Sequence, residues 1–282
     1  MKAIILNLSA WIMLPIMDGF AKYLSSTLPI LQITWSRYFF TIVIALPIML
    51  IFFRKNLVWT EQPKLQLIRG LLLFCANVLF FYSISVISLA KALTLAFIAP
   101  LIVTLLSPVL LQEKVGLRRW IAVIIGFIGS LIVIRPGFVE INLASIAALG
   151  TGVLYGFYLI VTRKLHNSDH PLLTLLLTGV VGAILGSSIM PFVWVQPTFT
   201  EWSMMFAIGF FASIGHLLLI LSLKYADASK LAPFGYFEIV TNIIIGFYFF
   251  NHFPDNWTFL GLFIIISTGI YIFKRDVINR SS

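Results

Sequence analysis

Residues 67–112 read LIRGLLLFCANVLFFYSISVISLAKALTLAFIAPLIVTLLSPVLLQ. This apolar run is more than twice the length of about 20 residues that one helix needs to cross a bilayer. Its best breaking point is residues 88–91 (SLAK), where a serine and a lysine stand close together. The run is therefore predicted to cross a membrane twice, as two helices that meet in a tight turn.

The same pattern continues along the chain. The sequence is 60% hydrophobic and only 10% charged, and its mean hydropathy of +1.04 is far above that of a soluble domain. Each span is apolar on all sides without the alternation of a strand, which predicts an all-α polytopic membrane protein. The longest loop, near residues 54–66, is too short to form a soluble domain. The ten expected spans are 3–24, 31–53, 67–88, 91–112, 119–135, 141–163, 171–194, 202–223, 228–250 and 257–274.

The basic residues give an orientation. Fifteen of the 19 Lys and Arg residues fall in the segments on one side of the expected spans. The other four, Lys22, Arg37, Lys91 and Arg135, lie within spans or at their opposite ends. The positive-inside rule therefore predicts that both termini are cytoplasmic. The net charge of +9 is a topology signal of this kind, and no nucleic-acid partner is expected.

The two halves of the chain resemble each other in order, at an offset of 137 to 142 residues. This similarity predicts two five-helix repeats, residues 1–138 and 139–282. Because five is odd, the second copy enters the membrane from the opposite side. Such inverted repeats are typical of secondary transporters, whose substrate sites lie near the midplane between the repeats. The matched positions are Gly19-Phe20 with Gly156-Phe157, Pro29 with Pro171, Ser83 with Ser222, Lys91 with Lys230, and Ile128-Gly129 with Thr268-Gly269.

An ordered set of short motifs carries a family resemblance. Taken together, the set resembles the EamA-type transporters of the drug/metabolite transporter superfamily over nearly the whole chain. Residues 236–255 look most similar to S-adenosylmethionine uptake carriers, and neighbouring branches move riboflavin, amino acids or other metabolites. His252 stands where many relatives have Glu, and we expect a structural effect from this departure. The motifs are DGFAKY (18–23), RYF (37–39), LAKAL (89–93), APL (99–101), LQEK (111–114), GFIG (126–129), KYADAS (224–229), AP (232–233), YFE (236–238) and FPD (253–255).

The resemblance implies a carrier with ten transmembrane helices and a central cavity, working in a bacterial inner membrane as a monomer or homodimer. Its implied partners are a small polar metabolite, the lipid bilayer, and a proton or sodium ion for coupling. The sequence contains no convergent catalytic set, no cofactor motif and no strong metal-ligand pattern, so an enzyme is not expected. A membrane-embedded enzyme and a channel remain the alternatives.

Ionisable groups inside a membrane are costly and are candidate functional residues. Asp18 lies about six residues from the outer end of the first span, and Lys22 lies one turn further out on the same face, so the two can pair. Arg37 lies about 10 Å into the second span from the same side. Two interpretations stay open for these residues, a cluster that contacts substrate or coupling ion and a structural ion pair between the first two helices.

Glu238 lies about ten residues into the ninth span, with no basic residue within a turn. It shares a helix face with Asn242. We expect Glu238 to bind a cationic substrate group or to exchange a proton, the alternative being a neutral glutamate that ties helices together. Tyr82 and Tyr236 are candidates for stacking on a flat substrate. Lys91 is a candidate for a pairing or cavity role, because a basic residue on the outer side opposes the positive-inside rule.

The remaining polar and aromatic groups in the spans favour structural roles. His216 is expected to be a hydrogen-bonded packing residue more than a proton relay. Trp11, Tyr155 and Tyr158, like Tyr82 and Tyr236, could stack on a flat substrate, but aromatic residues in spans are more often packing or lipid-facing. Glycine pairs at 152/156 and 182/186 predict close helix approach, within one chain more than between two.

Overall fold

The computed structural model describes residues 1–56, 59–87, 89–134, 142–250 and 255–281. Within these ranges the regular structure is entirely helical, which confirms the all-α prediction. The elements are α1 (Lys2–Leu24), α2 (Ile30–Phe52), η1 (Arg54–Asn56), α3 (Pro63–Val86), α4 (Leu89–Ala96), α5 (Ile98–Leu110), α6 (Leu117–Ile134), α7 (Leu143–Lys164), α8 (Pro171–Val193), α9 (Phe199–Tyr225), α10 (Ala228–Leu231), η3 (Ala232–Phe237), α11 (Glu238–Phe250) and α12 (Asn256–Ser281).

Seven helical segments of the described chain are long and apolar enough to cross a membrane. These segments include Ala228–Phe249, which runs through α10, η3 and α11. Two expected turns are confirmed, because α3 ends at Val86 and α4 begins at Leu89, and α9 ends at Tyr225 and α10 begins at Ala228. The long apolar runs therefore divide where polar residues interrupt them.

Local sequence signals set several helix starts. The Asn142 side chain caps α7 by accepting a hydrogen bond from the Ser145 backbone N–H. Thr198 and Glu201 form a capping box at the start of α9, each accepting from the backbone N–H of the other. Pro171 occupies the first turn of α8, where a missing N–H costs nothing.

Two apolar stretches are discontinuous, the stretch that contains the shorter apolar helix α5 and one of the seven segments. The first breaks at Phe97, between α4 and α5, and the second passes from α10 through the 3₁₀ turn η3 into α11. Pro100 and Pro233 explain the breaks, because a proline has no N–H to donate and its ring collides with the carbonyl four residues earlier. For Pro100 that carbonyl belongs to Ala96, the last residue of α4. Such breaks leave backbone groups in the membrane interior, which is tolerated beside a cavity.

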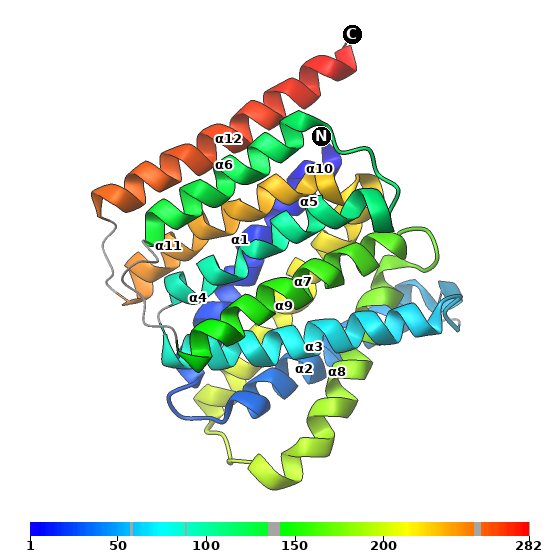
Figure 1. Cartoon of the computed structure of the whole chain (residues 1–282). Helices are drawn as coiled ribbons and strands as arrows, with labels where there is room; N and C mark the ends of the chain where they lie inside the picture. The colour runs from blue at the N-terminus through cyan, green and yellow to red at the C-terminus, as the bar shows by residue number, and fades with distance from the viewer. Residues whose placement is uncertain (57–58, 88, 135–141, 251–254, 282) are drawn as a thin grey trace.

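The long helices pack in four main pairs, α1 with α9, α3 with α7, α2 with α8, and α6 with α12 (Figure 1). Glycines allow the closest approaches. A Cβ added at Gly182 of α8 would lie 2.3 Å from the Tyr38 ring of α2, and one at Gly156 of α7 would lie 2.9 Å from Ile102 of α5. Both predicted glycine pairs therefore serve packing within the chain.

Both termini lie at the same end of the bundle, next to the N-terminal end of α6 (Figure 1). We call this the terminal end. Large apolar side chains such as Phe192, Phe249 and Phe263 project from the outside of the bundle, at exposed fractions of 85%, 76% and 70%. An apolar exterior of this kind is expected of a protein that faces lipid.

Candidate functional site

A cavity of about 100 Å³ lies inside the bundle, lined by residues of α1, α3, α4, α5, α7, α9, α10, η3 and α11. We call it the central cavity. Both discontinuous segments reach it, through Phe97 and Pro100 on one side and Ala232 and Gly235 on the other. The irregular backbone therefore lies where the protein encloses space inside the membrane.

Two carboxylates line the central cavity, Asp18 from α1 and Glu238 from the first turn of α11. Asp18 is only 3% exposed, and its Oδ1 atom has no hydrogen-bond partner among the described residues. Neither carboxylate forms an ion pair within 4.0 Å in the described part of the chain. The structure thus brings together two residues that the sequence singled out separately. Arg37 interacts electrostatically with Asp18 but does not form an ion pair with it.

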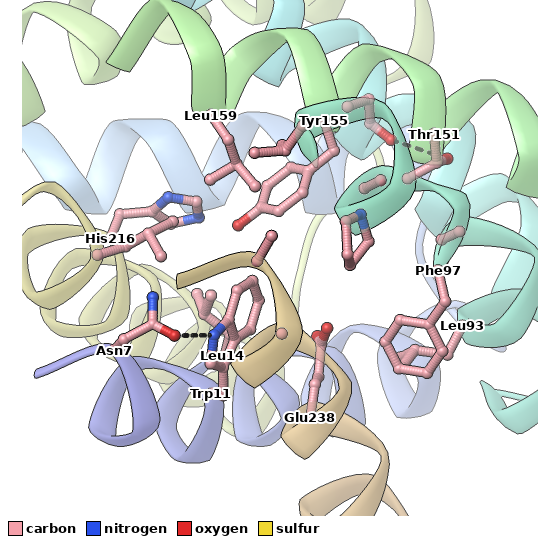
Figure 2. A pocket seen from close by; sticks show the side chains of 18 of the residues that line it. Asn7, Trp11, Leu14, Leu93, Phe97, Thr151, Tyr155, Leu159, His216 and Glu238 are labelled. Carbon is pink, nitrogen blue, oxygen red and sulfur yellow. Dashed lines mark hydrogen bonds between the residues drawn. The ribbon is translucent and has the colours of Figure 1, made fainter. Parts of the chain in front are cut away.

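Aromatic and amide side chains form the rest of the polar lining. The Trp11 indole N–H donates to Asn7 Oδ1 at 2.8 Å, and the ring lies 6.3 Å from that of Tyr155 in an edge-on arrangement. Figure 2 shows the Tyr155 hydroxyl and the Glu238 carboxylate pointing into the same space from opposite walls. The Tyr155 hydroxyl has no partner in the described part of the chain. Trp11 and Tyr155 therefore face the cavity rather than lipid.

Arg37 lies behind the central cavity, where it contacts His216 instead of Asp18. Its Nη2 donates to His216 Nε2, and its Nε lies 3.2 Å from Met17 Sδ. Because a guanidinium only donates, His216 Nε2 must accept, so the ring is neutral with its hydrogen on Nδ1. That hydrogen is donated to the Tyr158 hydroxyl at 2.9 Å. His216 is therefore a fully hydrogen-bonded residue, as the sequence favoured.

Arg69 of α3 also contacts Tyr158. From the sequence, Arg69 was counted only among the basic residues that indicate membrane orientation. The residue is 0% exposed. It donates to the Tyr158 hydroxyl at 2.8 Å, to Thr162 Oγ1 at 2.8 Å, to the Thr174 carbonyl at 3.1 Å, and to Thr178 Oγ1. Its partners lie about 90 to 110 positions later in the sequence, so no local pattern points to this site.

The predicted pair between Asp18 and Lys22 is not formed. Lys22 Nζ instead donates to the carbonyls of Ile84, at 2.8 Å, and Ile87, at 3.4 Å, at the end of α3. The last carbonyls of a helix lack intrahelical partners and attract a cation. Lys22 is half-buried and lies outside the central cavity. It therefore ties α1 to α3 and does not belong to a charged cluster with Asp18 and Arg37.

The other candidates lie outside the lining of the central cavity. Tyr236 packs on Gly126 and Phe97, and Asn242 Nδ2 donates to the Glu238 carbonyl at 3.0 Å. Tyr82 is half-buried on α3. The Lys91 side chain falls outside the part of the chain that the structure describes, as do His252 and Arg135.

A second group of charges lies at the terminal end, and we call it the terminal ion-pair cluster. Glu113, after α5, accepts from the Ala228 and Ser229 backbone N–H groups at 2.9 and 3.0 Å, and from Arg163 at 3.2 Å. Arg163 also pairs with Asp227 at 2.9 Å. Burial raises the pKa of Glu113, but these hydrogen bonds more than offset it and hold the pKa below its usual value. The cluster therefore joins the two halves of the chain.

Comparison with known proteins agrees with this architecture. The model of the EamA-like transporter family matches residues 1–135 and again residues 142–274. The chain belongs to the EamA-like transporter family. It is therefore an integral membrane protein of a transporter family.

Individual relatives of this EamA-like transporter have low sequence identity to it. It is 27% identical to an S-adenosylmethionine uptake transporter of Rickettsia bellii, over 92% of this chain and 89% of the relative. It is 27% identical to a riboflavin transporter of Vibrio cholerae, over 94% and 90% of the two chains. A crystal structure of a protein whose function is not named matches with a TM-score of 0.79, 17% identity and 94% coverage of both chains, which supports the fold alone.

Proposed function

We propose that this protein is a secondary carrier that moves a small cationic or zwitterionic metabolite by alternating access. The observation that carries the proposal is the pair of carboxylates, Asp18 and Glu238, that face one cavity and form no ion pair within 4.0 Å in the described part of the chain. A carboxylate buried in this way needs a positive partner or a proton. A transported cation supplies the first, and a coupling proton supplies the second.

We further propose ten transmembrane helices in two inverted repeats, residues 1–138 and 139–282. The family model matches each half separately, which supports a duplication. Under the proposed repeat, α1 corresponds to α7 and α3 corresponds to α9. The symmetry that relates the repeats therefore converts the packed pair α1–α9 into the packed pair α7–α3. The pairs α2–α8 and α6–α12 each map onto themselves. The two discontinuous segments also correspond, as expected of a substrate site between repeats.

The chemistry of the cavity lining and the names of the relatives together favour S-adenosylmethionine as the substrate. The cavity of about 100 Å³ must widen to admit it, as alternating access requires. S-adenosylmethionine carries a sulfonium and an ammonium, which suit Asp18 and Glu238, and a flat purine, which suits the rings of Trp11 and Tyr155. The Rickettsia bellii relative is named for its uptake. Riboflavin, which the Vibrio cholerae relative is named for, is neutral and gives the two carboxylates no positive partner.

The terminal ion-pair cluster is proposed to hold the terminal end closed in this conformation. Glu113 and Arg163 belong to different proposed repeats, so their contact must change if the repeats rock against each other. From the charge pattern we propose that this end faces the cytoplasm of a bacterial cell and that the protein lies in the inner membrane. A proton or a sodium ion is proposed as the coupling ion.

A matched pair of ligands tests the substrate class. S-adenosylhomocysteine lacks one methyl group of S-adenosylmethionine and with it the sulfonium charge. We expect S-adenosylmethionine to raise the Tm of the purified protein by several degrees, and S-adenosylhomocysteine and riboflavin to raise it much less, because stabilisation follows affinity. Equal stabilisation by the charged and uncharged ligands would remove the sulfonium from the proposal. A channel or an embedded enzyme, the two alternatives, would show no counterflow of substrate across a membrane.

A further inference from the structure

A second, smaller cavity lies behind His216, lined by residues of α2, α3, α7, α8 and α9. Its free volume is about 10 Å³, close to the room that one water-sized guest needs. The His216 ring lines both this space and the central cavity, so it separates the two. We call the smaller space the arginine cavity because Arg37 and Arg69 both line it.

Two positive charges meet at the arginine cavity without a negative one. Arg37 and Arg69 are 2% and 0% exposed, and none of the described residues that line the cavity is an aspartate or glutamate. Within the described hydrogen bonds, Arg69 donates only to neutral oxygen atoms. A buried charge is strongly destabilising unless an opposite charge compensates it. Asp18, in the adjoining central cavity, interacts electrostatically with Arg37 but forms no ion pair with it within 4.0 Å. The described lining of the arginine cavity itself therefore holds two positive charges and no negative one.

The hydrogen-bonding groups around the cavity are also mainly donors. Arg37 Nη1 is buried and has no partner among the described residues. The Tyr158 hydroxyl already accepts from Arg69 and His216, and the Tyr38 hydroxyl accepts from an asparagine of α3. The hydrogens of both hydroxyl groups thus have no acceptor in the described hydrogen bonds. The missing component is a guest that only accepts.

We propose that the arginine cavity binds a single monatomic anion of the halide class, of which chloride is the probe. Such an ion accepts from several donors at once and carries the negative charge that the site lacks. A carboxylate, sulfate or phosphate has too many heavy atoms for a space of about 10 Å³. A water molecule is small enough, but it must donate two hydrogens of its own.

The anion would fix one wall of the central cavity. It lies against Arg37, whose Nη2 atom holds His216 in its Nδ1–H form, and against Tyr158, which accepts the Nδ1 hydrogen. Losing the anion leaves the two guanidiniums to repel each other across the cavity. Anion binding therefore stabilises the packing of α2, α3, α7 and α9 around His216. This effect does not require the transported substrate.

Chloride binding can be measured directly on the full-length protein in lipid nanodiscs, in gluconate buffer without substrate. We expect saturable binding of one radiolabelled chloride per chain, with competition by bromide and none by acetate or sulfate. We also expect the Tm to rise saturably by several degrees when chloride replaces gluconate at constant ionic strength. No saturable binding to the wild-type protein, or equal stabilisation by sulfate, would overturn the proposal and leave water as the guest.

Two variants locate the ion, and a third variant serves as a control. Ala212 lines the cavity and is 2% exposed, so Ala212→Val fills the space without removing a polar group. Tyr158→Phe keeps the ring and removes the hydroxyl, which is a donor to the ion and an acceptor from Arg69 and His216. Each should weaken chloride binding at least tenfold, whereas Tyr82→Phe, on a tyrosine that lines neither cavity, should leave it unchanged. Unchanged binding in both cavity variants would place the ion elsewhere and contradict the assignment.

Discussion

The carboxylates of the terminal ion-pair cluster and those of the central cavity have opposite surroundings. Glu113 accepts from two backbone N–H groups and from Arg163, which also pairs with Asp227. Asp18 and Glu238 have no cation within 4.0 Å in the described part of the chain. A carboxylate whose oxygens the protein satisfies contributes to structure, whereas an unsatisfied one inside a membrane is available to a ligand. The four carboxylates therefore divide into two with basic partners, Glu113 and Asp227, and two without an ion pair, Asp18 and Glu238, for which we propose a functional role.

The largest effect is expected at Glu238. Glu238→Gln keeps the shape of the side chain but cannot ionise, so uptake should fall by about 30-fold or more, since losing a buried charge contact costs about 2 kcal/mol or more. The Tm should stay near that of the wild type. Net uptake and substrate exchange in proteoliposomes measure the effect, with Glu61→Gln, on an exposed loop, as the control.

The same variant separates two roles of Glu238. If the carboxylate binds substrate, net uptake and exchange should fail together. If it carries the coupling proton, exchange should survive while uptake driven by a pH gradient fails. Wild-type uptake with an unchanged pH profile would show that Glu238 is only structural.

A smaller loss is expected at Asp18. Asp18→Asn should reduce uptake by about tenfold, equivalent to about 1.4 kcal/mol. It should not lower the Tm, because the carboxylate has no ion-pair partner to lose and neutralising a buried charge removes a desolvation cost. A fall in Tm together with normal uptake would mean that Asp18 is a structural residue after all. Parallel uptake and thermal unfolding assays measure both quantities.

Glu113→Gln should act mainly on stability. The folded protein holds the pKa of Glu113 below its ordinary value of 4.5, so the ionised carboxylate stabilises the fold above that pH, and this stabilisation is lost as the pH falls through the folded pKa. The Tm of Glu113→Gln should therefore lie a few degrees below wild type at pH 7 and approach it below pH 4.5. A difference in Tm that is independent of pH would indicate that the charge of Glu113 is unimportant.

The smallest effect is expected at Lys22. Lys22→Met removes two hydrogen bonds to backbone carbonyls at the end of α3, which should lower stability by about 1 to 2 kcal/mol. Uptake should remain within about twofold of wild type, because Lys22 does not line the central cavity. A loss of uptake as large as that of Asp18→Asn would restore Lys22 to the binding site.

Much of the fold follows from local sequence signals. Hydrophobic runs give the helices, polar interruptions give the turns before Leu89 and Ala228, and prolines 100 and 233 explain the two broken segments. These features depend on neighbouring residues and on the solvent, which in a membrane is lipid. The two carboxylates of the central cavity were predicted individually, because a carboxylate inside a span is unusual wherever it occurs. Trp11, Tyr155 and His216, which also line it, were interpreted as packing residues.

Contacts between distant segments were not predictable in the same way. Lys22 was expected to pair one turn away with Asp18, but the carbonyls of Ile84 and Ile87 are better placed. Arg69 resembles a loop charge from its position near a span end, and only packing against α7 and α8 buries it. Helix periodicity describes one helix at a time, so it does not predict which neighbouring helix a long side chain contacts.

Counterflow of labelled S-adenosylmethionine in proteoliposomes tests the central claim most directly. Vesicles preloaded with unlabelled substrate should accumulate the label transiently above its equilibrium level, because an alternating-access carrier exchanges one substrate molecule for another. The double variant Asp18→Asn/Glu238→Gln should fold, as judged by its Tm, and show no such overshoot. Absence of an overshoot with the wild-type protein, or an equal overshoot with the double variant, would contradict transport through this pair of carboxylates.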